Sequence, residues 1–165
     1  MTTATRSAVD EVRRLVEAVP DPELPLISLG DLGVIRDVAL ADDGVVEVTI
    51  TPTYTGCPAM ETIHGSIRAV LAGCGHPDGR VRQVLSPAWT TDWISTDGLR
   101  KLAENGIAPP GPAGAPLPVR IGIGVPCPNC GSAATRPQSA FGATRCQSIL
   151  VCTACRETFA HMRAT

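Results

Sequence analysis

The chain has 165 residues, a formal net charge of −2 and 44% hydrophobic residues, enough for one ordinary domain and a small appendage. No apolar run approaches the roughly 18 residues that a membrane-spanning helix needs, and the first residues lack the apolar core of a signal peptide. Seven cysteines without an export signal lead us to expect a cytoplasmic protein whose thiols bind metal or react.

The first fifty residues predict a helix followed by a β-hairpin. Apolar residues recur at helical spacing over residues 9–19, and Pro20 ends that pattern. Two β-branched runs, residues 34–40 and 45–50, flank Asp42-Asp43-Gly44. An Asp-Gly turn between two such runs is a strong hairpin signal.

The next fifty residues predict a helix, a strand and a short helix. Residues 58–73 place their apolar side chains on one helical face, and residues 81–85 resemble a third strand. Residues 96–105 predict a short helix capped by Thr96. The order of elements predicts an α/β (α+β) fold, a small sandwich of one sheet with helices on one face.

A proline-rich segment, residues 108–118, predicts a semi-rigid linker between two domains. We therefore expect a first domain over residues 1–107 and a second over residues 119–165. Residues 1–118 carry nine basic and fifteen acidic side chains, a net charge of −6, whereas residues 119–165 carry five arginines and one glutamate, a net charge of +4. The basic part could dock on an acidic surface or simply be solvated.

Two Cys-x-x-Cys pairs in the second domain predict a zinc ribbon with four thiolate ligands, Cys127, Cys130, Cys152 and Cys155. Gly131, directly after the first pair, allows the backbone to turn so that N–H groups point at the sulfurs. A segment this short buries little apolar surface, so the metal would supply much of its stability. Two disulfides are the alternative pairing, and Cys146 is an alternative ligand.

In the first domain Cys57 is the candidate functional thiol. It lies between the second predicted strand and the second predicted helix, where we expect it at the N-cap with Pro58 in the first helical position. The helix dipole there would lower the pKa of the thiol and make it a candidate nucleophile or metal ligand. The alternative is a small structural residue at a tight turn.

Several segments together resemble known families. Residues 21–25 (Asp-Pro-Glu-Leu-Pro), residues 28–35 and residues 51–58 with Cys57 are similar to the SufT-like iron–sulfur-assembly domain family. Together with Trp89–Ser95, the linker, the four-cysteine ribbon and residues 139–146, the chain resembles the D-subunit family of the phenylacetyl-CoA epoxidase system. The tail departs from that pattern, with Thr158 and Met162 where Pro and Phe are expected.

The resemblance implies an accessory role in aerobic phenylacetate degradation, with no catalytic activity of its own. It implies help with maturation or insertion of iron or iron–sulfur cofactors, and other epoxidase subunits as partners. We expect Cys57, Asp31 and Thr55 to be the cluster-related residues. Asp21, Glu23 and Asp31 could assist a metal near Cys57, or could simply cap turns. Zinc would be structural, and an iron centre or iron–sulfur cluster would be held transiently.

Two other function classes stay open. A zinc-ribbon adaptor or nucleic-acid-binding regulator would use the ribbon arginines, although five arginines are few for a nucleic-acid surface. A thiol enzyme using Cys57 would need a general base that the sequence does not supply. We expect neither nucleic acid nor a membrane as a partner, and a homo-oligomer stays open.

Overall fold

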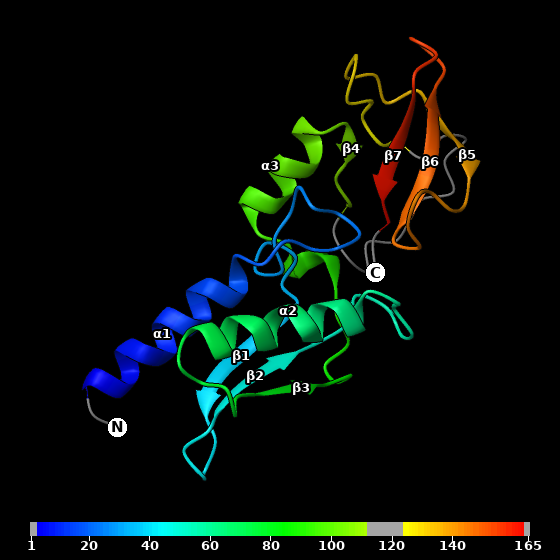
Figure 1. The fold of residues 1–165 in the computed structure, drawn as a ribbon. Coiled ribbons are helices and arrows are strands. Elements are labelled where there is room, and N and C mark those ends of the chain that lie inside the picture. Colours follow the sequence, from blue (N-terminus) through cyan, green and yellow to red (C-terminus); the bar gives the residue numbers. More distant parts are fainter. Residues whose placement is uncertain (1–2, 112–123, 164–165) are drawn as a thin grey trace. The chain divides into compact units, whose positions relative to one another are not determined.

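The computed structural model describes residues 3–111 and 124–163, with side chains from Ala8 onward. The chain forms two compact units that divide between Trp89 and Thr90 (Figure 1). In the described part of the chain, no helix is both long and apolar enough to cross a membrane.

The first unit is a three-stranded sheet covered on one face by two helices (Figure 1). Its elements are α1 (Thr3–Glu17), β1 (Ile35–Leu40), β2 (Val46–Ile50), α2 (Met60–Gly73) and β3 (Arg80–Gln83). Strands β1 and β2 are antiparallel, and β2 and β3 are parallel with α2 as the connection between them. The expected α+β class is confirmed, as are the two helices and three strands of this unit.

Periodic apolar side chains place the core between helices and sheet. Helix α2 buries Ile63, Ile67 and Leu71 on one face, each at most 2% exposed. The strands supply Val48 and Ile50, both fully buried. The hairpin turn forms as predicted because Gly44 adopts a left-handed backbone with φ of 79°.

Helix α2 begins two residues later than expected. Its N-cap is Ala59, and the first helical hydrogen bond runs from the Ile63 N–H to the Ala59 carbonyl at 2.9 Å. Residues 57–60 instead form a turn in which the Met60 N–H donates to the Cys57 carbonyl at 3.4 Å. The prediction that Cys57 is the N-cap was therefore wrong, because this extra turn separates the cysteine from the helix.

The second unit contains helix α3 (Thr96–Glu104), a short 3₁₀ segment η1 (Thr91–Trp93) and a four-stranded sheet. The strands are β4 (Ile107–Ala108), β5 (Thr135–Ser139), β6 (Gln147–Cys152) and β7 (Thr158–Met162), in the order β4-β7-β6-β5. A small core joins the sheet to the cysteine turns, with Ala108, Cys127, Leu150, Cys152 and Phe159 buried together.

The division between units differs from the expected boundary at residue 107. Strand β4 pairs in parallel with β7, with Ile107 opposite Ala160 and Ala108 opposite His161, so α3 and β4 group with the ribbon. This pairing is possible because both residues precede Pro109 and keep their N–H groups. Most of the expected linker, residues 112–118, lies outside the described residues.

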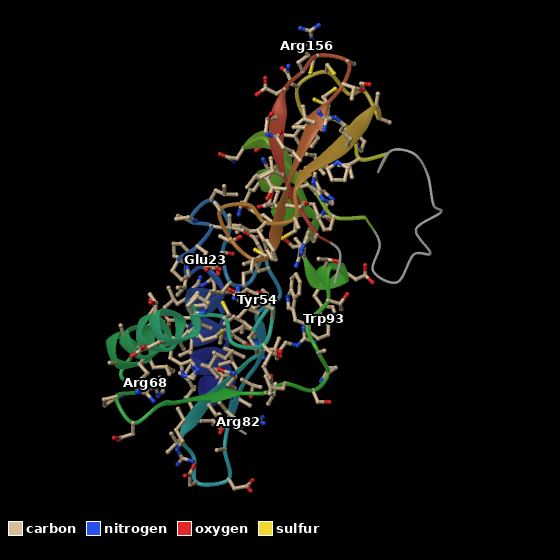
Figure 2. The ribbon with its side chains drawn as sticks, turned by 90° about the vertical axis from the view of Figure 1, so that its right-hand side faces the viewer. Glu23, Tyr54, Arg68, Arg82, Trp93 and Arg156 are labelled. Atoms are coloured by element: carbon tan, nitrogen blue, oxygen red, sulfur yellow. The ribbon has the colours of Figure 1, made fainter. Side chains whose placement is uncertain are left out.

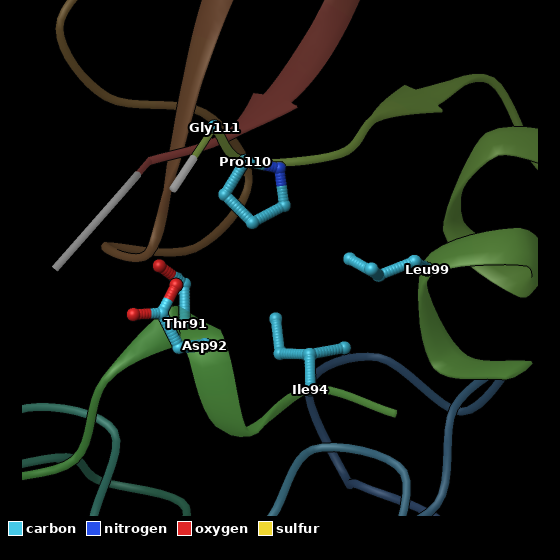
Figure 3. Close-up of a pocket in the computed structure, with 6 residues that line it drawn as sticks. All are labelled: Thr91, Asp92, Ile94, Leu99, Pro110 and Gly111. Carbon is cyan, nitrogen blue, oxygen red and sulfur yellow. The ribbon is translucent and has the colours of Figure 1, made fainter. Parts of the chain in front are cut away.

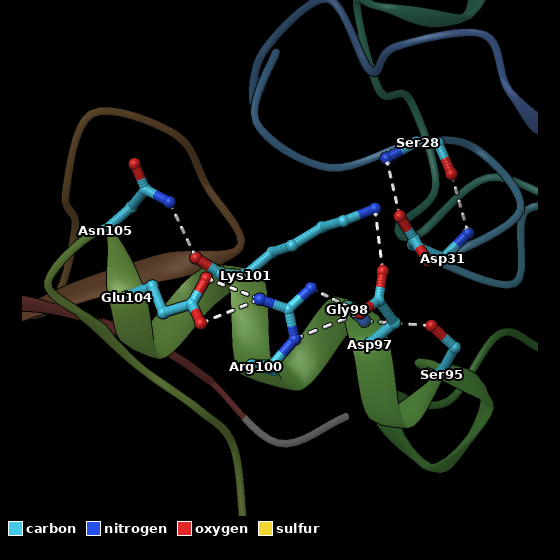
Figure 4. A network of polar contacts seen from close by, with 9 residues as sticks. All are labelled: Ser28, Asp31, Ser95, Asp97, Gly98, Arg100, Lys101, Glu104 and Asn105. Carbon is cyan, nitrogen blue, oxygen red and sulfur yellow. Dashed lines mark hydrogen bonds and ion pairs between the residues drawn. The ribbon is translucent and has the colours of Figure 1, made fainter.

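Helix α3 is capped by Ser95 rather than by Thr96. The Gly98 N–H donates to Ser95 Oγ at 2.9 Å, and Ser95 has the extended backbone that an N-cap requires. Along the exposed face, Arg100 pairs with Asp97 and Glu104, as Figure 4 shows. The prediction of Thr96 as the cap was wrong by one residue, because either hydroxyl satisfies the sequence pattern.

Candidate functional site

Four cysteine sulfurs converge at one end of the ribbon. The Sγ atoms of Cys127, Cys130, Cys152 and Cys155 all lie within 4.8 Å of one another. Two of the separations, Cys127 to Cys155 and Cys130 to Cys152, are 3.7 Å. In Figure 2 the sulfur atoms gather beside Arg156. Among the residues that the structure describes, this is the one group of three or more potential metal ligands at such distances.

Both Cys-x-x-Cys pairs use the same backbone turn. In the first, the Gly131 N–H donates to the Cys127 carbonyl at 2.8 Å, and in the second, the Arg156 N–H donates to the Cys152 carbonyl at 2.9 Å. Gly131 and Arg156 both have a positive φ, 72° and 67°. This left-handed residue directs the next N–H back toward the second sulfur of each pair.

Hydrogen bonds and crowding separate the acidities of the two exposed thiols. The Glu157 N–H donates to the sulfur of Cys155 and lowers the pKa of that thiol to about 7. Cys130 receives the equivalent N–H from Ser132, but the neighbouring Cys155 sulfur and burial raise its pKa to about 12. Of these two thiols Cys155 is the more acidic, and a bound cation would favour the thiolate form of all four cysteines.

The donor set fits a zinc ion. A tetrahedral zinc with Zn–S bonds of about 2.3 Å has sulfur-to-sulfur edges of roughly 3.8 Å, close to the two 3.7 Å separations. Four thiolates with N–H···S hydrogen bonds are the usual surroundings of a structural zinc. That these four residues bind zinc stays a prediction, and the geometry agrees with it.

Cys146 lies outside the four-sulfur group. Its sulfur contacts Thr144 Oγ1 at 2.8 Å, and its residue immediately precedes β6, whereas Cys152 ends that strand. The length of β6 therefore separates Cys146 from the cluster. The structure favours Cys127, Cys130, Cys152 and Cys155 over the alternative in which Cys146 is a ligand.

In the first unit, Cys57 lies in the loop between β2 and α2 with its side chain partly exposed. The Ala59 N–H and the Tyr54 hydroxyl both donate to its sulfur, which favours the thiolate. Sequence reasoning missed Tyr54, although its position three residues before Cys57 in the same turn is a usable signal.

The pKa of Cys57 is raised, contrary to expectation. Burial is the largest cause, and the negative charges of Glu23 and Asp21 add to it, so that the two hydrogen bonds to the sulfur are outweighed. The predicted depression failed because Cys57 lies outside the helix and two carboxylates, distant in sequence, approach it. Cys57 is therefore a protonated thiol at neutral pH in the free protein.

The two carboxylates come from the loop that follows α1. Asp21 is buried, and its Oδ1 accepts the N–H groups of Glu23 at 2.9 Å and Leu24 at 2.8 Å. Burial raises the pKa of Asp21 and, together with the charge of Asp21, that of Glu23. Glu23 and Tyr54 lie at the same end of the helix-on-sheet unit (Figure 2). The structure thus gathers a thiol, a phenol and two carboxylates.

The other two predicted residues are Asp31 and Thr55. Asp31 forms a reciprocal turn with Ser28, in which each side-chain oxygen accepts the other residue's N–H, at 3.3 and 3.0 Å (Figure 4). Thr55 is exposed two residues before Cys57. Their roles stay predictions.

A pocket of about 290 Å³ in the second unit lacks the chemistry of a metal site. It is lined by Thr91, Asp92, Ile94, Leu99, Pro110 and Gly111 (Figure 3). Its single carboxylate stands among apolar and small residues, with no thiol or imidazole in the lining. This pocket therefore adds no metal ligand set to Cys57 and the ribbon cysteines.

The fold and two family matches define the chain as an iron–sulfur-assembly-type domain followed by a zinc ribbon. Residues 9–85 match the iron–sulfur cluster assembly protein family, and residues 121–163 match the PaaD zinc beta ribbon domain. A crystal structure of a domain of unknown function, DUF59, from Bacillus anthracis covers 60% of this chain and 94% of its own length, with 26% identity and a TM-score of 0.54.

Similarity along most of the chain identifies the particular family. A protein of Escherichia coli (strain K12), named as the D subunit of a 1,2-phenylacetyl-CoA epoxidase, is 40% identical over 155 residues, covering 94% of this chain and 92% of its own. The chain belongs to this D-subunit family. The iron–sulfur protein maturation auxiliary factor SufT of Staphylococcus aureus (strain USA300) is 40% identical over 78 residues, covering 47% of this chain and 88% of its own.

Proposed function

We propose that this chain is an accessory factor of the phenylacetyl-CoA epoxidase system that assists maturation or insertion of iron or iron–sulfur cofactors. Two similarities support the proposal: the D-subunit relative along nearly the whole chain, and relatives of the first domain named as iron–sulfur protein maturation auxiliary factors. The other epoxidase subunits would be its partners.

The observation that carries the proposal is the surroundings of Cys57. The carboxylates of Glu23 and Asp21 disfavour a bare thiolate, but the same charges favour a thiolate paired with a cation. An iron centre that arrives as cargo would displace the thiol proton, since metal ligands bind deprotonated. Once the cargo leaves, the thiol would be protonated again, which suits transient rather than permanent binding.

The ribbon would have a separate, structural task. We propose that its four cysteines hold one zinc ion that replaces the hydrophobic core that so small a segment lacks. Zinc would fix the two cysteine turns against β5, β6 and β7. It would take no part in the handling of iron at Cys57.

The test is growth on phenylacetate of a strain that lacks this protein. Cys57→Ser should leave the fold intact and fail to restore growth, with less iron in the oxygenase isolated from those cells. Cys74→Ser is the matched control, because Cys74 is also a partly exposed thiol but directly follows α2, at its far end, and this variant should restore growth. If Cys57→Ser restores growth as well as the wild type, Cys57 is structural and the proposed chemistry is wrong.

A further inference from the structure

Phe141 is exposed, unlike the other four aromatic side chains, all of which lie within the described ranges. It is 62% exposed, whereas Trp89 is 5% and Phe159 6% exposed, and Tyr54 and Trp93 are half-buried. Single exposed apolar residues are common on protein surfaces. The exposure of Phe141 therefore needs further observations before it indicates a function.

The loop between β5 and β6 holds Phe141 in place. Ser139 Oγ donates to the Phe141 carbonyl at 2.7 Å and accepts the Phe141 N–H at 3.2 Å. The next residue, Gly142, donates its N–H to the Gln147 carbonyl at 2.9 Å. A Cβ on Gly142 would lie only 2.9 Å from the Gln147 Cβ, so the loop packs closely against β6. The ring is presented outward by a defined turn.

Two arginines accompany the ring. The Arg163 guanidinium lies 5.8 Å from the centroid of the Phe141 ring, within cation–π range, and its Nη1 donates to the Ala140 carbonyl at 3.4 Å. Arg145 is exposed in the same loop. The one acidic residue of the ribbon, Glu157, lies in the second cysteine turn. We call Phe141, Arg145 and Arg163 the hairpin tip.

The hairpin tip and the cysteine cluster occupy opposite ends of β6. Cys152, a member of the cluster, ends the strand, whereas the Arg163 N–H donates to the carbonyl of Cys146, directly before it, at 3.0 Å. The tip is thus not needed to hold metal. An aromatic ring with one arginine beside it and a second arginine in the same loop has the composition of an interface hot spot, in which aromatic residues and arginine are enriched.

We propose that the hairpin tip docks on an acidic surface of the epoxidase complex. Phe141 would enter an apolar recess of that surface while Arg145 and Arg163 pair with carboxylates around it. The net charge of +4 over residues 119–165 would speed the encounter and select against basic partners. This inference rests on the proposed function, because that function names the partner.

The test is binding of the full-length, zinc-loaded chain to the purified epoxidase complex, measured by interferometry. Phe141→Ala should weaken binding by at least about tenfold, as expected for a hot spot, and Phe141→Tyr should retain it. Arg163→Gln should weaken binding and reduce its salt dependence. Two matched controls should bind normally. Leu85→Ala truncates another apolar side chain, 60% exposed, and Arg136→Gln removes an exposed charge on β5.

The outcomes separate this inference from the proposed function. Cys57→Ser should bind the complex like the wild type and yet fail to support growth. If Phe141→Ala binds as tightly as the wild type, or Leu85→Ala loses as much, the docking surface is wrong even where growth still depends on Cys57. The inference would also be wrong if the wild type does not bind the epoxidase but forms homo-oligomers that Phe141→Ala abolishes.

Discussion

Gly131 and Arg156 occupy equivalent positions in the two cysteine turns. Each directly follows the second cysteine of its pair, and their φ angles, 72° and 67°, agree within a few degrees. The left-handed backbone aims the next N–H, from Ser132 or Glu157, at the sulfur. Glycine adopts this conformation freely, whereas arginine is strained there.

We therefore expect Gly131→Ala and Arg156→Gly to change the free energy of unfolding in opposite directions. Gly131→Ala should lower the free energy of unfolding by about 1 kcal/mol, because an L-residue pays a left-handed penalty of roughly 1–2 kcal/mol, partly offset by a less flexible unfolded chain. Arg156→Gly should be neutral or stabilising by up to about 1 kcal/mol for the same reason in reverse. Urea unfolding at a fixed excess of zinc measures both. A loss in Arg156→Gly as large as in Gly131→Ala would contradict this account.

Metal content tests the ligand set. Cys130→Ser should lose about one zinc per chain and unfold the ribbon, while the first unit stays folded with its own core. Elemental analysis and amide hydrogen exchange report the two effects. Cys146→Ser is the matched control and should keep its zinc, because Cys146 lies outside the cluster. Full zinc retention in Cys130→Ser would show that the ligands are misassigned.

Because the pKa of Cys57 is raised, we expect its thiol to be alkylated slowly, and we expect one substitution to increase that rate. The negative charge of Glu23 disfavours a thiolate at Cys57. Glu23→Gln should lower the pKa of Cys57, so a larger thiolate fraction exists at pH 8 and alkylation becomes several-fold faster. Rates between pH 7 and 10, in a zinc-loaded background with Cys74 and Cys146 replaced by Ser, give the pKa directly. The control Glu11→Gln, on α1, should leave the rate unchanged.

Two adjacent residues with hydroxyl groups, Ser95 and Thr96, lie at the start of α3, and Ser95 is the one that caps the helix. Ser95→Ala removes the acceptor of the Gly98 N–H and should cost about 1 kcal/mol, a typical N-cap effect. Thr96→Ala should change stability by a few tenths of a kcal/mol, because Thr96 is an exposed residue of the first turn. Thermal unfolding of the two variants under the same zinc concentration is the measurement. Equal losses would mean that Thr96 shares the capping role.

Features set by neighbouring residues were predictable from the sequence. The hairpin turn depends on Gly44, the end of α1 on Pro20, and the convergence of each cysteine pair on a spacing of three residues. Each results from backbone conformations within a few positions, and such local preferences operate wherever the segment lies. The structure accordingly confirms the helices and strands of the first unit and brings the ribbon cysteines together.

Features that depend on distant residues were decided by the tertiary structure. The surroundings of Cys57 include Glu23 and Asp21 from another loop, and their charges with burial reverse the expected direction of its pKa. The Trp89 indole donates to the Leu32 carbonyl at 2.8 Å across 57 positions of sequence, and β4 joins β7 past the proline-rich segment. No local pattern encodes such contacts, because they form only when packing brings remote segments together and removes water from between them.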